Sequence, residues 1–158
     1  MKVYISGKIG EEVISEATRQ KFAKAEEMLK AKGFEVFNPT CEGWQKSLIF
    51  GYGVDVQQAP PPEDGKISKY AYILLRDQMA LANKDAILML EDWQDSPGAT
   101  SEYYFAMATG KKIFFASRVH AVLRLEEDWK EANKTMKMRA PRYKYVDLHL
   151  HESWLPIN

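Results

Sequence analysis

Short apolar runs alternate with amphipathic stretches along the chain. The runs are rich in β-branched and aromatic residues and end near Gly, Pro or Asn, which is typical of buried strands; they lie at residues 2–6, 34–39, 85–90, 111–117 and 143–150. The stretches between them repeat apolar residues at helical spacing; they lie at residues 11–32, 66–83, 97–109 and 122–136. This order predicts one α/β domain over residues 1–158, with a flavodoxin-like or Rossmann-like parallel sheet of about five strands and helices on both faces.

The segment from Thr40 to Asp64 fits neither pattern and is expected to be an irregular loop. It contains GYG, three consecutive prolines and several aromatic residues. A long irregular segment in a compact domain is often a lid or a binding loop. It can equally be a packed surface excursion with no part in chemistry, and the pattern leaves both interpretations open.

Charge and cysteine content narrow the class of protein. The 22 basic and 22 acidic side chains cancel, so no global field favours a nucleic acid polymer or an anionic membrane as partner. Cys41 is the single cysteine, which excludes an internal disulfide and suits a reducing compartment. The sequence has neither an apolar leader at its start nor an apolar run of about 18 residues, and we therefore expect a cytoplasmic protein.

A ligand site is expected outside the carboxyl ends of the strands, as in other open parallel sheets. SGKIG at residues 6–10, NPTCEG at 38–43 and EDWQDSPGATSE at 91–102 meet at that edge. Ser6, Gly7 and Lys8 begin the first of these loops, where glycines let the backbone approach a ligand. SGKIG is neither the dinucleotide fingerprint nor a P-loop, so NAD and ATP are rejected and no cofactor is expected.

Ser96 and Pro97 form a good helix start. With Ser96 as N-cap, the backbone amides of Gly98 and Ala99 and the helix dipole make an anion site. The alternative is that the Ser-Pro pair only starts the helix and binds nothing.

Glu102 is the acid that most needs an explanation. A carboxylate near a helix N-terminus is favoured electrostatically, which accounts for its charge. Its spacing from Ala99, Tyr103 and Ala106 nevertheless places it beside the buried face of the helix. A buried acid needs a partner or a chemical role.

Two further groups of residues have alternative interpretations. His149 and His151 can present two imidazoles on one side of a strand, but no third ligand is evident, and no metal site is predicted. Trp44, Tyr52 and Trp93 can stack on a base or pack as core and rim residues.

Two segments, VYISGKIG at residues 3–10 and RDQMALANKDAILMLEDWQDSPGATSEYYFAMATGKKIF at 76–114, carry a resemblance to a known superfamily. They are similar to nucleoside 2-deoxyribosyltransferases, nearest to the branch of 2'-deoxynucleoside 5'-phosphate N-hydrolases and to related small uncharacterised phage and bacterial proteins. The resemblance implies cleavage or transfer of the N-glycosidic bond of a 2'-deoxynucleoside or its 5'-monophosphate. The alternative is a nucleotide-binding module without turnover.

The resemblance also implies roles for individual residues. Glu102, the acid of GATSE, matches the nucleophile, and Asp77 matches the catalytic aspartate, with Asp85 following at the start of the third strand. Tyr4 matches a tyrosine beside the sugar and the carboxylates. Ser96 stands where the phosphate-hydrolysing branch has a serine and the nucleoside transferases have an aspartate, which would repel a 5'-phosphate.

The resemblance further implies assembly, because members of this superfamily commonly complete their pockets with a neighbouring subunit. We therefore expect a homo-oligomer. The ligand that it binds is expected to be a small nucleoside or nucleotide. Trp154 and Leu155 offer apolar surface for the contact between subunits.

Overall fold

The computed structural model describes residues 1–11, 13–48, 68–116, 143–146 and 154–156. Strands and helices alternate through the first three of these ranges, and the last two are strands. The elements are β1 (Lys2–Ser6), α1 (Glu16–Ala31), β2 (Glu35–Phe37), α3 (Lys69–Ala82), β3 (Ala86–Met89), the 3₁₀ turn η1 (Trp93–Asp95), α4 (Pro97–Ala108), β4 (Lys112–Phe115), β5 (Tyr143–Val146) and β6 (Trp154–Pro156).

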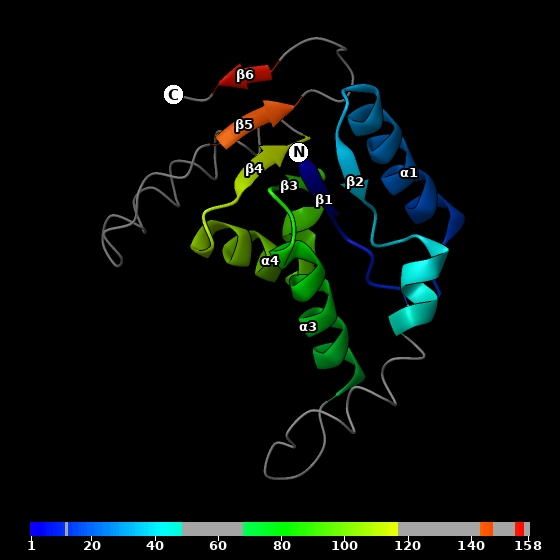
Figure 1. Cartoon of the computed structure of the whole chain (residues 1–158). Coiled ribbons are helices and arrows are strands. Elements are labelled where there is room, and N and C mark those ends of the chain that lie inside the picture. Colours follow the sequence, from blue (N-terminus) through cyan, green and yellow to red (C-terminus); the bar gives the residue numbers. More distant parts are fainter. Residues whose placement is uncertain (12, 49–67, 117–142, 147–153, 157–158) are drawn as a thin grey trace.

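The strands form one sheet in the order β2-β1-β3-β4-β5-β6 (Figure 1). The first five in this order are parallel, and β6 pairs antiparallel with β5 at the edge. The order of the parallel strands is that of flavodoxin-like folds, so the predicted class and sheet are confirmed. The expected count of about five strands is not confirmed. Four parallel strands, β2-β1-β3-β4, form the part of the sheet that described helices flank, and β5 and β6 bring the total to six.

Helices cover both faces of this sheet, with α1 on one and α3 and α4 on the other (Figure 1). Successive residues of a strand point to opposite faces, so each strand contributes to two apolar layers. The layer under α1 contains Val3, Ile5, Phe22, Ala25, Leu29, Ala86, Leu88, Leu90, Phe114 and Ala116. The layer under α3 and α4 contains Tyr4, Leu81, Ile87, Met89, Trp93, Ala99, Tyr103, Ala106, Ile113 and Phe115.

Capping residues set the helix boundaries. Helix α1 begins at Glu16 rather than at the expected residue 11, because the Ser15 hydroxyl accepts the Thr18 N–H and acts as N-cap. The side chain of Glu11 instead accepts bonds from the backbone N–H and the hydroxyl of Ser15. Helix α4 begins at Pro97 as predicted, and Gly110, with φ of +69°, follows its end in the left-handed region.

Part of the segment that was expected to be irregular is helical. Residues 42–48 form a short helix after Thr40, whose N–H and hydroxyl both donate to the Asn38 side chain. Prolines and glycines further along the segment obscured this helix in the sequence. The rest of the segment, residues 49–67, lies outside the described residues, as do the predicted helix 122–136 and the residues Tyr52, His149 and His151.

Trp154 and Leu155, expected at a contact between subunits, belong to β6 and pair with β5 through the backbone. Among the helices that the structure describes, none combines the length and the apolar character needed to cross a bilayer.

Candidate active site

Glu102 lies inside the domain, at the edge where β1 and β3 end. Only 6% of its surface is exposed, and Ala99, Tyr103 and Ala106 on the same helix are buried with it. Spacing in the sequence therefore predicted its face correctly. A carboxyl group with so little access to water needs partners from neighbouring elements.

Two hydroxyl groups of β1 supply these partners. The Tyr4 phenol donates to Glu102 Oε1 at 2.7 Å, and the Ser6 hydroxyl donates to Oε2 at 2.5 Å. Tyr4 and Ser6 are two residues apart on one strand, so both point to the face that α4 covers. Each carboxylate oxygen thus has one donor, and Glu102 is fixed against the sheet.

The surroundings of Glu102 alter its acidity. Its pKa is raised to about 8: burial raises the pKa most, the nearby charge of Asp77 also raises it, and the hydrogen bonds from Ser6 and Tyr4 lower it. The pKa of Tyr4 also lies well above its usual value, because the phenol is buried and faces the charges of Glu102 and Asp77. The phenol therefore remains a donor throughout the neutral range.

Asp77 of α3 is the second carboxyl of this site. Burial raises its pKa to about 6, although the hydrogen bond from Trp44 and the charge of Arg76 lower it. Trp44 Nε1 donates to Asp77 Oδ1 at 2.9 Å. The two carboxyls thus differ in acidity, with Asp77 the stronger acid. A pair of carboxyls whose environments separate their pKa values is typical of acid–base chemistry, and here a single shared proton lies mainly on Glu102.

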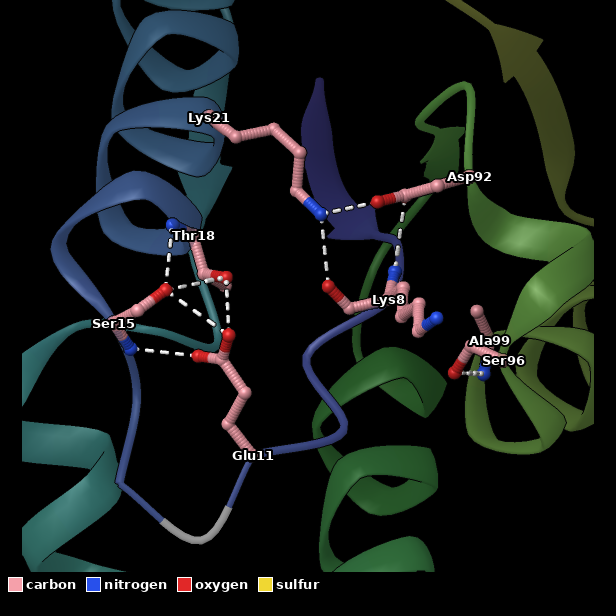
Figure 2. A network of polar contacts seen from close by, with 8 residues as sticks. All are labelled: Lys8, Glu11, Ser15, Thr18, Lys21, Asp92, Ser96 and Ala99. Atoms are coloured by element: carbon pink, nitrogen blue, oxygen red, sulfur yellow. Dashed lines mark hydrogen bonds and ion pairs between the residues drawn. The ribbon is translucent and has the colours of Figure 1, made fainter.

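The loop after β1 is held to the loop after β3 by a charged clamp (Figure 2). Asp92 accepts the backbone N–H of Lys8 at 3.1 Å and pairs with Lys21 of α1 at 2.5 Å. Lys21 also donates to the Lys8 carbonyl at 2.8 Å. Gly7 permits this close approach, because a Cβ there would lie 3.0 Å from Leu90 Cβ. This clamp could not be predicted from the sequence, where only the acidic character of the loop is visible.

Ser96 and Lys8 lie beside the start of α4. The Ser96 hydroxyl accepts the Ala99 N–H at 3.2 Å, which makes Ser96 the helix cap that the sequence predicts. The Lys8 side chain is exposed, and Figure 2 shows it directed toward this helix start. Gly98 follows in the first turn of α4. A Cβ atom added at this glycine would lie 3.3 Å from Leu74 Cδ2.

Not every residue singled out in the sequence lies in the site. Asp85 lies at the amino end of β3, at the opposite end of the strands from Glu102. There it is exposed and accepts the Lys2 N–H at 2.7 Å. Trp93 is fully buried and packs on Tyr103 with ring centroids 4.7 Å apart, which is a core position. Within the part of the chain that the structure describes, no three His, Cys, Asp or Glu side chains are grouped as metal ligands.

Comparison with known proteins identifies a family without assigning an activity. The family described as "Domain of unknown function (DUF4406)" matches residues 1–115, and the chain belongs to this family. Among solved structures, a 2-deoxyribosyltransferase from the psychrotolerant bacterium Bacillus psychrosaccharolyticus is similar, with 19% identity and a TM-score of 0.45. The alignment covers 75% of this chain and 74% of that one. No curated protein matches the chain significantly.

Proposed function

We propose that this protein cleaves or transfers the N-glycosidic bond of a 2'-deoxynucleoside or its 5'-monophosphate, with Glu102 as nucleophile. The observation that carries the proposal is the buried Glu102 carboxyl, held by Tyr4 and Ser6 and influenced by the charge of Asp77. The resemblance of GATSE and of the first-strand tyrosine to nucleoside 2-deoxyribosyltransferases supports the same assignment.

In the first step, a Glu102 oxygen attacks the anomeric carbon, C1', of the sugar. The bond from C1' to the base nitrogen breaks, and its electron pair leaves with the base. Asp77, in its protonated form, gives its proton to the departing base. The products of this step are the free base and a deoxyribosyl ester of Glu102.

In the second step, an acceptor attacks C1' and releases Glu102 as a carboxylate. If water is the acceptor, it loses its proton to Asp77 and the protein is a hydrolase. If a second base is the acceptor, its nitrogen loses the proton to Asp77 and the protein is a transferase. Both outcomes use the same two carboxyls and retain the configuration at C1'.

The test is incubation with the common 2'-deoxynucleosides and their 5'-monophosphates, followed by chromatography for free base. We expect base release from at least one of them, with exchange when a second base is added if the protein is a transferase. Binding of a monophosphate by calorimetry without release of base from any of them would contradict the proposal. That outcome would favour the nucleotide-binding module instead.

Ser96 supports a preference for the 5'-monophosphate over the nucleoside. Its oxygen accepts the Ala99 N–H, which leaves its own hydroxyl proton to donate to a phosphate oxygen, and Lys8 lies on the same side. Hydrogen bonds to charged groups contribute about 1.5 to 3 kcal/mol, so one such bond in the transition state changes kcat/KM by about tenfold or more. We therefore expect kcat/KM to be higher for the monophosphate.

Replacing Ser96 tests this preference directly. Ser96→Asp is expected to reverse it, because a carboxylate repels phosphate and accepts from a 5'-hydroxyl group. Ser96→Asn is the matched control, since Asn caps a helix as well as Asp does but carries no charge. Equal kcat/KM for the two substrates in the parent and both variants would show that Ser96 is only a cap.

A further inference from the structure

Trp44 joins the short helix at residues 42–48 to the candidate catalytic carboxyls. Its indole N–H donates to Asp77 Oδ1 at 2.9 Å, across 33 positions of sequence. Its ring packs edge-on against Phe37 at 5.1 Å, and the Arg76 guanidinium lies 5.4 Å from it. The indole is therefore held by an aromatic ring and a guanidinium group, while its one polar atom points at a carboxyl.

The packing continues from Trp44 to the partner of Glu102. Phe37 stacks on Tyr4 with ring centroids 5.3 Å apart and planes inclined by 17°. Tyr4 in turn donates to Glu102. The rings of Trp44, Phe37 and Tyr4 thus form a continuous series that links the donor to Asp77 with the donor to Glu102, and the packing of Phe37 between them fixes their spacing.

The hydrogen bond makes the two oxygens of Asp77 unequal. Oδ1 accepts the indole N–H, and an indole can donate but not accept. A proton on Oδ1 would compete with that bond, so a protonated Asp77 carries its proton on Oδ2. Among the described residues, Trp44 is the one that donates a hydrogen bond to this carboxyl.

We propose that Trp44 is a positioning residue, which orients Asp77 so that Oδ2 is the oxygen that gives its proton to the leaving base and recovers it from the acceptor. This inference rests on the proposed function. Trp44 itself does not exchange a proton in either step. Its role is to hold the carboxyl at one rotation and to keep Oδ1 occupied.

The first test is Trp44→Phe, which keeps an aromatic ring against Phe37 and Arg76 and removes the donor. We expect kcat to fall about tenfold, with a smaller change in KM, because the lost bond stabilises the negative charge that Asp77 gains as it gives up its proton in the transition state. In an Asp77→Asn background, the same substitution is expected to cause no further loss of kcat. An equal loss in both backgrounds would show that Trp44 acts through the fold and would overturn the proposal.

The second test needs no substrate. Titration of Asp77 by carboxyl ¹³C NMR is expected to give a higher pKa in Trp44→Phe than in the parent, because the indole bond favours the charged carboxylate. An unchanged pKa would overturn the inference even if the parent is active. A raised pKa in Trp44→Phe, together with a parent that releases no base, would uphold the contact between Trp44 and Asp77 and refute the proposed function, so the two failures are distinguishable.

Discussion

Glu102→Gln is expected to lower base release by about 10³-fold or more, because removal of a nucleophile from a catalytic unit has effects of at least this size. The amide keeps the shape of the side chain and its oxygen can still accept one of the two bonds from Tyr4 and Ser6, but it does not form a glycosyl ester. Chromatography with whichever substrate the parent accepts measures the change. Release of base at the parent rate would remove Glu102 from the mechanism.

Stability as a function of pH provides the control for folding. The folded protein holds the Glu102 proton up to about pH 8, whereas the unfolded chain loses it near the ordinary value of 4.5. Between these values the folded state binds more protons, so this group lowers the free energy of unfolding as pH rises. The loss is on the order of 3 to 5 kcal/mol and is complete above pH 8. Glu102→Gln has no such pH-dependent loss of stability. Denaturant unfolding should therefore show the free energy of unfolding of the variant rising relative to that of the parent from pH 5 to pH 8.

Asp77→Asn is expected to lower kcat/KM by about 10²- to 10⁴-fold, the range for loss of a general acid. The control is a deoxynucleoside whose base carries a positive charge, such as the N7-methylated guanine derivative, because such a base leaves without being protonated. Its cleavage should be much less affected by the substitution. An equal loss on both substrates would show that Asp77 does not supply the proton.

The pH dependence follows from the same two groups. The reactive form has Glu102 ionised and Asp77 protonated. Between about pH 6 and pH 8 the pair holds one proton, mainly on Glu102, so the reactive form is the minor arrangement of that proton. With pKa values of about 6 and 8, kcat/KM of the parent should rise to about pH 6, stay level, and fall above about pH 8. In Asp77→Asn only Glu102 titrates, so the profile should rise with pH and lose its alkaline fall. Retention of both limbs would assign the alkaline limb to another group.

Much of the fold could be predicted from the apolar runs of the sequence and from the residues that begin and end them. β1 matches its predicted range, residues 2–6, and α4 runs from Pro97 nearly to Gly110, because start and stop residues bracket each apolar run. β6 escaped prediction because its three residues, Trp154–Pro156, are too few to show a period of two. The helix at residues 42–48 escaped for a similar reason, since two turns beside a Pro-rich and Gly-rich segment show no clear stripe.

The candidate site was predictable only as far as local spacing and the resemblance of short motifs reach. Helical spacing placed Glu102 on the buried face. The bond between Trp44 and Asp77 and the pairing of Lys21 with Asp92 join positions 33 and 71 residues apart. Such contacts depend on how helices are placed over the sheet, and neither an indole donor nor a surface lysine leaves a periodic signal.

The configuration of the product tests the nucleophilic role of Glu102 most directly. When methanol replaces water as the acceptor, a covalent deoxyribosyl intermediate on Glu102 requires two displacements at C1', so the β-linked substrate should yield the β-methyl deoxyriboside, identified by ¹H NMR. A single displacement by the acceptor inverts the configuration. Formation of the α-methyl deoxyriboside would therefore contradict the account, because no ester of Glu102 would lie on the path.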